Sequence, residues 1–116
     1  MKILLIINDP PYGTERSFDA LRLTLALMKE EEKPDLSVFL MADAVFAAKS
    51  GQKTPDGYYS LESMVKSAIQ QAEVVLCGTC MDARGLGESE LVPGAKRGTM
   101  PQLAKLTLAA DKVLVF

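Results

Sequence analysis

Four short, uninterrupted apolar runs are the feature that most restricts what this chain can fold into. Strands that are buried on both faces have this pattern, whereas strands with one exposed face alternate between apolar and polar residues. Continuous runs of this kind are typical of parallel sheets, whose two faces are covered by helices. The runs are KILLII (2–7), LSVFLM (36–41), VVLC (74–77) and KVLVF (112–116).

The segments between these runs have the spacing of amphipathic helices. Helices are predicted over residues 15–31, 61–71 and 100–110, with Thr99 as the N-cap of the last and Pro101 in its first turn. Strand and helix in alternation predict right-handed βαβ crossovers and a three-layer α/β/α sandwich. The expected core faces are Phe18, Leu21, Leu25 and Met28 in the first helix, and Leu61, Met64, Val65, Ala68 and Ile69 in the second.

The remaining segment, residues 84–98, is rich in glycine and charge. We expect a loop here, with a short helical turn and a short edge strand near residues 94–97. No repeat or linker interrupts the chain, and its 116 residues suit one domain spanning residues 1–116.

Composition and charge exclude several classes of protein. The basic residues are scattered and the formal net charge is −2, so we expect no nucleic-acid partner. The opening MKILLIIND is too short for a signal peptide and is better interpreted as a strand. No apolar run approaches the roughly 20 residues that span a bilayer, so we expect no membrane association. A cytoplasmic location follows as an expectation, and thiols are kept reduced there.

The predicted architecture also indicates where a functional site would lie. Ligands of open parallel α/β sheets bind beyond the carboxyl ends of the strands. Loops 8–17, 42–59 and 77–85 leave those ends and carry turn residues beside polar ones. The candidate site residues are Asn8, Tyr12, Asp43, Gln52, Tyr58, Cys77, Cys80, Asp82 and Arg84.

Both cysteines of the chain lie in one Cys-x-x-Cys sequence, CGTC (77–80), directly after the third apolar run. In a reducing compartment such a pair is more often reactive or metal-bound than a structural disulfide. Cys77 would close a strand beside a helix N-terminus, and with Arg84 nearby its thiolate would be favoured. The alternatives are a redox pair, half of a metal site, or two small core residues.

Metal binding is the weaker of these alternatives. A structural zinc site needs four ligands, and the chain has no histidine and one cysteine pair. Only two subunits that pooled their pairs would supply four thiolates, so we expect no metal and no cofactor. A thioredoxin-like oxidoreductase is also disfavoured, because nothing in the sequence corresponds to the cis-proline loop of that fold.

Other candidate residues have two interpretations each. Asp43 is most simply a helix N-cap. Arg84 would orient an anionic sulfur species or pair with Asp82. Tyr12 and Tyr58 would cover the cysteine pocket or pack at an interface. Loop 8–17 lacks the glycine spacing of a P-loop or a Rossmann fingerprint and is best interpreted as a turn.

Several separated motifs resemble the YchN-like branch of the DsrE/DsrF family of small sulfur-metabolism proteins. The resemblance implies a DsrEFH-like fold with a mainly parallel five-stranded sheet and homo-oligomers, trimers or hexamers. It also implies a sulfur relay, with sulfurtransferase-like chemistry and a persulfide on Cys77, and donor and acceptor proteins as partners. The motifs are PPYGTE (10–15), LRLTLAL (21–27), FLMADAV (39–45), GQK (51–53), GY (57–58), LCGTCMDARG (76–85), GT (98–99) and AADKVLVF (109–116).

A second function stays open from the residues alone. The same cleft would hold a small anion or nucleotide in a non-catalytic homo-oligomer, and the cysteines would then be structural. Both functions agree with apolar residues outside the core faces of the first and last helices, which a monomer would expose. These residues are Leu23, Ala26 and Leu27, and Leu106, Ala109 and Ala110.

Overall fold

Five parallel strands form one sheet at the centre of the molecule. The computed structural model describes all 116 residues. The order of the strands in the sheet is β4-β3-β2-β1-β5, and every neighbouring pair is parallel. The α/β fold with a five-stranded parallel sheet is therefore confirmed. The strands are β1 (Lys2–Ile7), β2 (Asp35–Leu40), β3 (Ala72–Cys77), β4 (Lys96–Gly98) and β5 (Lys112–Val115).

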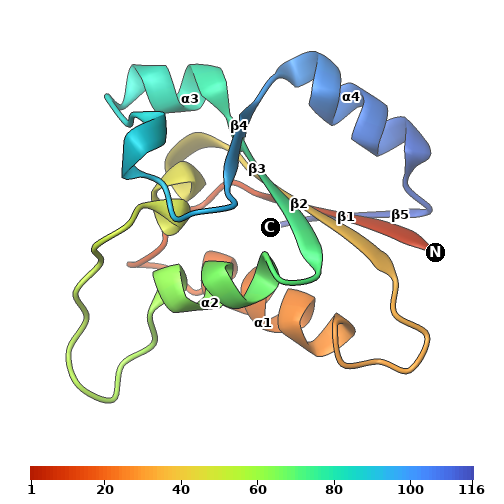
Figure 1. The fold of residues 1–116 in the computed structure, drawn as a ribbon, viewed down its shortest axis with the longest axis horizontal. Helices are drawn as coiled ribbons and strands as arrows, with labels where there is room; N and C mark the ends of the chain where they lie inside the picture. The colour runs from red at the N-terminus through yellow and green to blue at the C-terminus, as the bar shows by residue number, and fades with distance from the viewer.

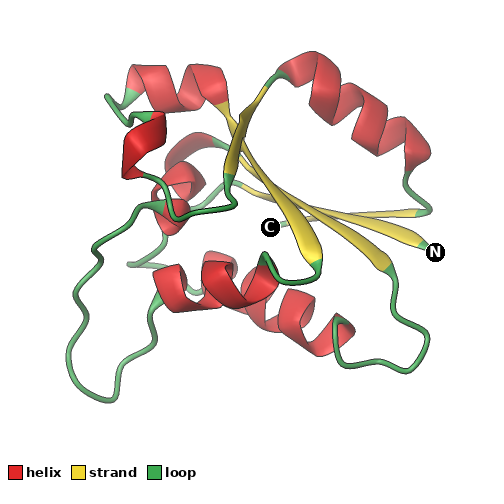
Figure 2. Cartoon of the chain, viewed as in Figure 1, coloured by secondary structure: helices red, strands yellow, loops and turns green.

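Helices cover the two faces of the sheet unequally. Helices α1 (Arg16–Leu27) and α2 (Leu61–Ala68) lie side by side on one face, below the sheet in Figure 1, and α4 (Met100–Ala109) lies on the other. Figure 2 shows the resulting three layers, with strands between helices. Three shorter helical segments complete the chain: η1 (Ala42–Ala48), α3 (Gly78–Ala83) and η2 (Glu88–Glu90).

The core is divided by the sheet into a large and a small cluster. The large cluster lies on the α1 and α2 side and includes Val74 and Leu76 of β3. Because side chains alternate along a strand, Val75 and Cys77 point to the opposite face. The small cluster there is made of Leu4, Phe39, Val75, Cys77 and Leu103. Cys77 therefore lies on the face of the sheet that α4 covers.

Helix α1 differs from its prediction in length and in its buried face. It ends at Leu27 rather than residue 31, and its buried residues are Ser17, Ala20, Leu21 and Thr24. The hydroxyl of Ser17 donates to the carbonyl of Asp9 at 2.6 Å, and that of Thr24 donates to the carbonyl of Ala20 at 2.9 Å. These bonds make burial of polar side chains inexpensive. Small residues on this face let α1 approach the sheet closely. Leu25 and Met28 pack at its margins, and Phe18 stacks on Tyr59.

The ends of other elements shift by smaller amounts. Helix α2 ends at Ala68 rather than residue 71, and β4 occupies residues 96–98 rather than 94–97. Thr99 is the N-cap of α4 as expected, since its hydroxyl accepts the N–H of Gln102 at 3.3 Å. The interpretation of Asp43 as an N-cap was wrong. The chain turns one residue earlier, at Ala42, and the N-cap position of η1 falls on Met41.

Exposed apolar side chains gather on α4 and β5. Leu103 is the one buried residue of α4, whereas Leu108 is 89% exposed. In β5, an edge strand that pairs only with β1, Val115 is 66% exposed. The apolar excess expected on α1 is smaller, because Leu23 and Leu27 pack partly against the large core cluster. No helix of the chain is both long and apolar enough to cross a membrane.

Candidate functional site

Cys77 is held where β3 passes into α3. It is the last residue of the strand and the N-cap of the helix. Its Sγ accepts the backbone N–H of Cys80 at 3.3 Å and lies 3.4 Å from the hydroxyl oxygen of Thr79. The residue is 5% exposed. The backbone of Cys77 is therefore fixed by the sheet. Its sulfur has two hydrogen-bond partners and little exposure to solvent.

Cys80 is positioned from the other side by η1. Its Sγ accepts the backbone N–H of Ala42 at 3.2 Å. Ala42 has a φ of 50°, in the left-handed region, where a residue with a Cβ is strained by about 1–3 kcal/mol. Strain of this kind is often found at functional sites. The sharp turn after β2 thus directs a backbone donor at the second sulfur.

The two thiols have opposite pKa shifts. Burial raises the pKa of the Cys77 thiol, but hydrogen bonds from the Cys80 thiol, from Thr79 and from backbone N–H groups outweigh it, and the pKa is lowered. Burial and the interaction with Cys77 raise the pKa of Cys80, against the Ala42 N–H and the charge of Arg84. On deprotonation Cys77 becomes the thiolate first, and Cys80 remains the thiol that donates to it.

Arg97 is a site residue that the sequence did not reveal. Its guanidinium binds Asp82 through two hydrogen bonds of 2.7 Å and lies against Gly78, the residue after Cys77. A Cβ at Gly78 would lie 2.8 Å from the Arg97 Nε, so glycine is needed for this approach. The partial charge of Cys77 raises the pKa of Arg97, after the larger effect of Asp82. Arg97 is therefore the cation beside Cys77.

The pairing of strands explains why Arg97 was missed. β4 has three residues, and it brings Arg97 opposite Leu76 and Gly98 opposite Cys77. The only signal in the sequence was a basic pair, KR (96–97), next to the predicted edge strand. Nothing there fixes the register of β4 against β3.

Arg84 pairs with a different carboxylate from the one expected. It pairs with Asp43 at 2.7 Å and donates to the carbonyl of Cys80 at 3.1 Å. It does not pair with Asp82, which binds Arg97. Arg84 therefore links the C-terminal end of α3 to η1, and its charge affects the pKa of Cys80.

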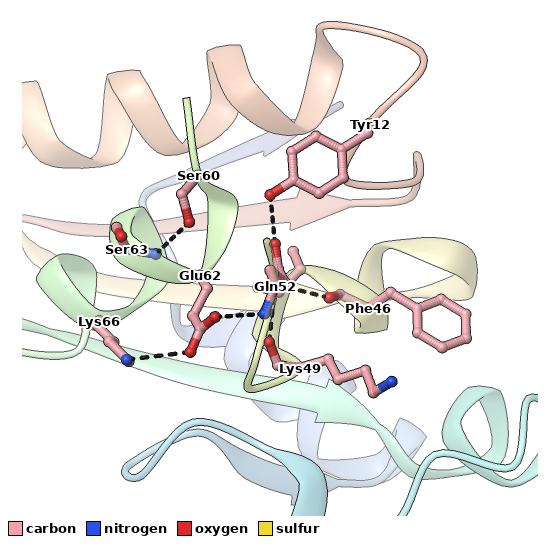
Figure 3. Close-up of polar contacts among 9 residues, drawn as sticks. Tyr12, Phe46, Lys49, Gln52, Ser60, Glu62, Ser63 and Lys66 are labelled. Carbon is pink, nitrogen blue, oxygen red and sulfur yellow. Dashed lines mark hydrogen bonds and ion pairs between the residues drawn. The ribbon is translucent and has the colours of Figure 1, made fainter. Parts of the chain in front are cut away.

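Tyr12 and Gln52 form a separate polar network (Figure 3). The hydroxyl of Tyr12 donates to Gln52 Oε1 at 2.5 Å and accepts the N–H of Leu61 at 3.1 Å. Gln52 Nε2 donates to the carbonyls of Phe46, Ala47 and Lys49, which end η1, and its backbone N–H donates to Glu62 Oε1 at 2.8 Å. No hydrogen bond joins this network to the cysteines. Its contacts indicate a structural role in holding the loop after η1.

The last two candidates, Asn8 and Tyr58, also bond or stack elsewhere. Asn8 Nδ2 donates to the carbonyl of Phe116 at 3.1 Å, which joins the ends of β1 and β5. Tyr58 stacks on Tyr59, with ring centroids 4.5 Å apart, and raises the pKa of that phenol to about 12. The structure therefore brings five of the nine candidates together: Asp43, Cys77, Cys80, Asp82 and Arg84.

The expected cleft beyond the carboxyl ends is not formed by the single chain. Its one cavity, of about 190 Å³, lies at the opposite, amino ends of the strands. Lys2, Asp35 and Glu73 line it together with residues of α4. Three or more metal-ligating side chains do not meet anywhere in the chain. What the cysteine region offers is two free thiols, one buried and one partly buried.

The sequence matches the model of the DsrE/DsrF-like family over residues 1–116. It is 44% identical over 115 residues to protein YchN of Escherichia coli K12, covering 99% of this chain and 98% of that protein. It is 38% identical over 117 residues to an uncharacterised protein of Methanocaldococcus jannaschii, and the match covers the whole of both chains.

Solved structures match this chain over nearly its whole length as well. The crystal structure of YchN from E. coli superposes with a TM-score of 0.93, covering 100% of this chain and 99% of that one. A protein of unknown function from Methanobacterium thermoautotrophicum superposes with a TM-score of 0.75 at 15% identity, covering 98% and 99% of the two chains, which shows the shared fold alone. With a full-length family match and a relative at 44% identity, this chain belongs to the DsrE/DsrF-like family.

Proposed function

We propose that this protein is a sulfur-relay protein in which Cys77 accepts a sulfane sulfur as a persulfide and passes it to a partner. The observation that carries the proposal is the environment of Cys77. A sulfur at a fixed strand end accepts the Cys80 N–H at 3.3 Å, faces the Thr79 hydroxyl and has a lowered pKa. Thiolates, not thiols, attack sulfur donors.

Each step of the relay uses the same feature of Cys77. The thiolate attacks a sulfur of a polysulfide or a donor persulfide, and the remainder of the donor leaves with the bonding electron pair. In the second step an acceptor thiolate attacks the outer sulfur, and Cys77 leaves as a thiolate. A thiol of lower pKa is the better leaving group, so the hydrogen bonds that favour uptake also favour transfer.

The exposure of Cys77 limits which donors can reach it. At 5% exposure Cys77 admits a small polysulfide directly. A protein donor must insert its reacting group or displace the side chains that cover Cys77. The sulfur-relay role brings with it sulfur donor and acceptor proteins and, for a chain with reduced thiols, a cytoplasmic location.

The proposal includes assembly as a homo-oligomer, a trimer or a hexamer. The exposed apolar residues of α4 and β5, including Leu108 and Val115, support it. Exposed apolar patches of several hundred Å² usually mark interfaces. Because α4 covers the same face of the sheet that holds Cys77, an oligomer built through α4 would place subunit boundaries near the site.

Sulfur loading tests the proposed function. The native protein is exposed to polysulfide without oxygen, desalted, and weighed by intact mass spectrometry, with peptide mapping to locate the added sulfur. Wild-type protein and Cys80→Ser should gain sulfur on Cys77, while Cys77→Ser should gain none and keep its fold. Normal loading of Cys77→Ser would defeat the proposal and favour structural cysteines.

A further inference from the structure

Cys80 is close enough to Cys77 to react with it. In an α-helix, residues three apart have Cα atoms about 5 Å apart, within the roughly 4.4–6.8 Å that disulfides span. Here the spacing is three residues, at the first turn of α3, and the backbone N–H of Cys80 donates to the sulfur of Cys77 at 3.3 Å. This contact places both cysteine side chains at the same turn, as a reaction between their sulfurs requires.

The surroundings of Cys80 keep its sulfur at this position. The Ala42 N–H reaches Cys80 Sγ at 3.2 Å from a strained backbone, and the Arg84 guanidinium holds the Cys80 carbonyl at 3.1 Å. Arg84 is in turn bound to Asp43 of η1. A thiol that served only to fill space would need neither contact, so both observations indicate a positioned reactant.

We propose that Cys80 is a resolving thiol, which attacks the persulfide of Cys77 and releases its outer sulfur as sulfide. This inference rests on the proposed function, because it begins from the persulfide on Cys77. It adds a second reaction to the site: reduction of a sulfane sulfur to sulfide by the protein's own two thiols.

The step balances without an added oxidant or reductant. Cys80 sulfur attacks the inner sulfur of the persulfide, a Cys77–Cys80 disulfide bond forms, and the bond between inner and outer sulfur breaks. Cys80 attacks as the thiolate after its proton has passed to the outer sulfur, which then leaves with the bonding electron pair as hydrosulfide. Two thiol sulfurs are oxidised and one sulfane sulfur is reduced. A cellular dithiol reductant then returns the disulfide to two thiols.

Two attacks on the persulfide therefore compete. A partner thiolate that attacks the outer sulfur removes it as sulfane sulfur, whereas Cys80 attacks the inner sulfur and discharges it as sulfide. The raised pKa of Cys80 keeps that thiol protonated while Cys77 takes up sulfur. Uptake of sulfur by Cys77 and its release as sulfide are therefore separate steps. Cys80 thus sets how long the protein carries sulfur when no acceptor is bound.

The experiment follows the loaded protein in time. Wild type, Cys80→Ser and Cys80→Ala are loaded with polysulfide without oxygen and desalted. Sulfane sulfur is then counted as thiocyanate after cyanide treatment, free sulfide is trapped, and the intact mass is followed. Serine keeps a donor to Cys77 but removes the nucleophile, and alanine removes both. Agreement between the two variants therefore assigns the effect to the attacking sulfur.

Wild type should lose its sulfane sulfur, release one sulfide per chain, and end two hydrogen atoms lighter than the unloaded protein. Both variants should hold the persulfide about tenfold longer or more, because a neighbouring nucleophile acts at high effective concentration. Equal persistence in wild type and variants, with no sulfide and no disulfide, overturns the resolving role and leaves the carrier intact. Failure of all three proteins to load Cys77 removes the proposed function and this inference with it.

Discussion

The charge beside Cys77 comes from Arg97, and Asp82 partly neutralises it. Asp82 and Arg97 share two bonds of 2.7 Å on the surface of α3. The Arg97 guanidinium lowers the pKa of Asp82 by direct hydrogen bonding, so the pair remains ionised at neutral pH. The two members of this pair should therefore act on the Cys77 thiolate in opposite directions.

Substitution of each partner tests this arrangement. Arg97→Gln removes the cation and should slow alkylation of Cys77 near neutral pH by a factor of about 2–5, the range expected for exposed charges. Asp82→Asn leaves the Arg97 guanidinium unpaired and should speed alkylation of Cys77. Thiolate absorbance against pH should show the pKa of Cys77 rising in the first variant and falling in the second. Shifts of the same sign in both variants would mean that the pair acts on structure rather than charge.

At this scale the sequence predicted the position of Cys77 in the fold better than the contacts of the residues around it. Cys77 could be placed at a strand end because the apolar run stops there. The partners of Arg84 and Asp82 could not be predicted, since each depends on which segment folds against α3. Asp43 comes from η1 and Arg97 from β4, at sequence separations of 41 and 15 residues. The pattern of residues within one segment gives no information on ion pairs between segments that are distant in the sequence.

Among the elements, the loop after η1 depends on Gln52. Its amide donates to the carbonyls of Phe46, Ala47 and Lys49 at the end of η1 and accepts the Tyr12 hydroxyl, whereas the carbonyl of Phe46 also accepts the backbone N–H of Lys49. A helix end without such partners is costly. Figure 3 shows the amide at the centre of these contacts.

Gln52→Ala should lower the free energy of unfolding by about 1–3 kcal/mol, because the carbonyls of Ala47 and Lys49 and the Tyr12 hydroxyl lose a hydrogen-bond partner. Chemical denaturation with matched m-values measures it. Lys53→Ala, an exposed position in the same loop, is the control and should change stability by less than about 0.5 kcal/mol. Equal effects of the two substitutions would show that the amide does not hold the loop.

Glu62, at the start of α2, gives this network a pH dependence. Burial raises its pKa, but the N–H groups of Gln52 and Gly51 and the Lys66 ammonium outweigh it, and the pKa in the folded protein lies below the ordinary 4.5. A depressed carboxyl pKa stabilises the fold above the unfolded-state value, and this contribution is lost as the pH falls through the folded-state value.

Wild-type protein should therefore lose stability as the pH falls below about 4.5, and Glu62→Gln should lose less over the same interval. Denaturation midpoints between pH 3 and pH 7 for the two proteins provide the test. Parallel pH profiles would contradict a stabilising role for the Glu62 carboxylate.

Element types were predicted well and element ends less well. The helix predicted over residues 15–31 spans only Arg16–Leu27, with Met28 as its C-cap. Its buried face is centred on Ser17, Ala20 and Thr24, which apolar periodicity cannot detect. Two of these are hydroxyl residues whose donors are satisfied within the backbone, a fact that only the folded structure reveals.

For the whole molecule, the apolar surface of α4 and β5 remains to be explained. Leu108 is 89% exposed, so its substitution cannot disturb the core of a single chain. A change in assembly caused by this residue would therefore locate an interface. The one pocket of the chain lies at the amino ends of the strands and not at the carboxyl ends, where the general rule for parallel sheets places a cleft.

Wild-type protein should scatter light as a trimer or hexamer at micromolar concentration, and Leu108→Glu should shift it toward single subunits with unchanged circular dichroism. Lys105→Glu, on an exposed part of the same helix, is the matched control for an added acidic residue. A wild-type mass equal to one subunit would refute the oligomer.

The reactivity of the two thiols in the folded protein tests the central claim most directly. Native and unfolded protein are treated with a small uncharged alkylating probe from pH 6 to pH 10, and modification of each cysteine is followed by peptide mass spectrometry. In the native protein Cys77 should react faster than Cys80 at neutral pH, and the pH midpoint of its reactivity should lie below that of the unfolded chain. The difference in rate between the two cysteines should become smaller as the pH rises and Cys80 ionises. Reaction of Cys80 first at every pH, or of either thiol only after unfolding, would contradict the assignment of Cys77 as the sulfur-accepting thiolate.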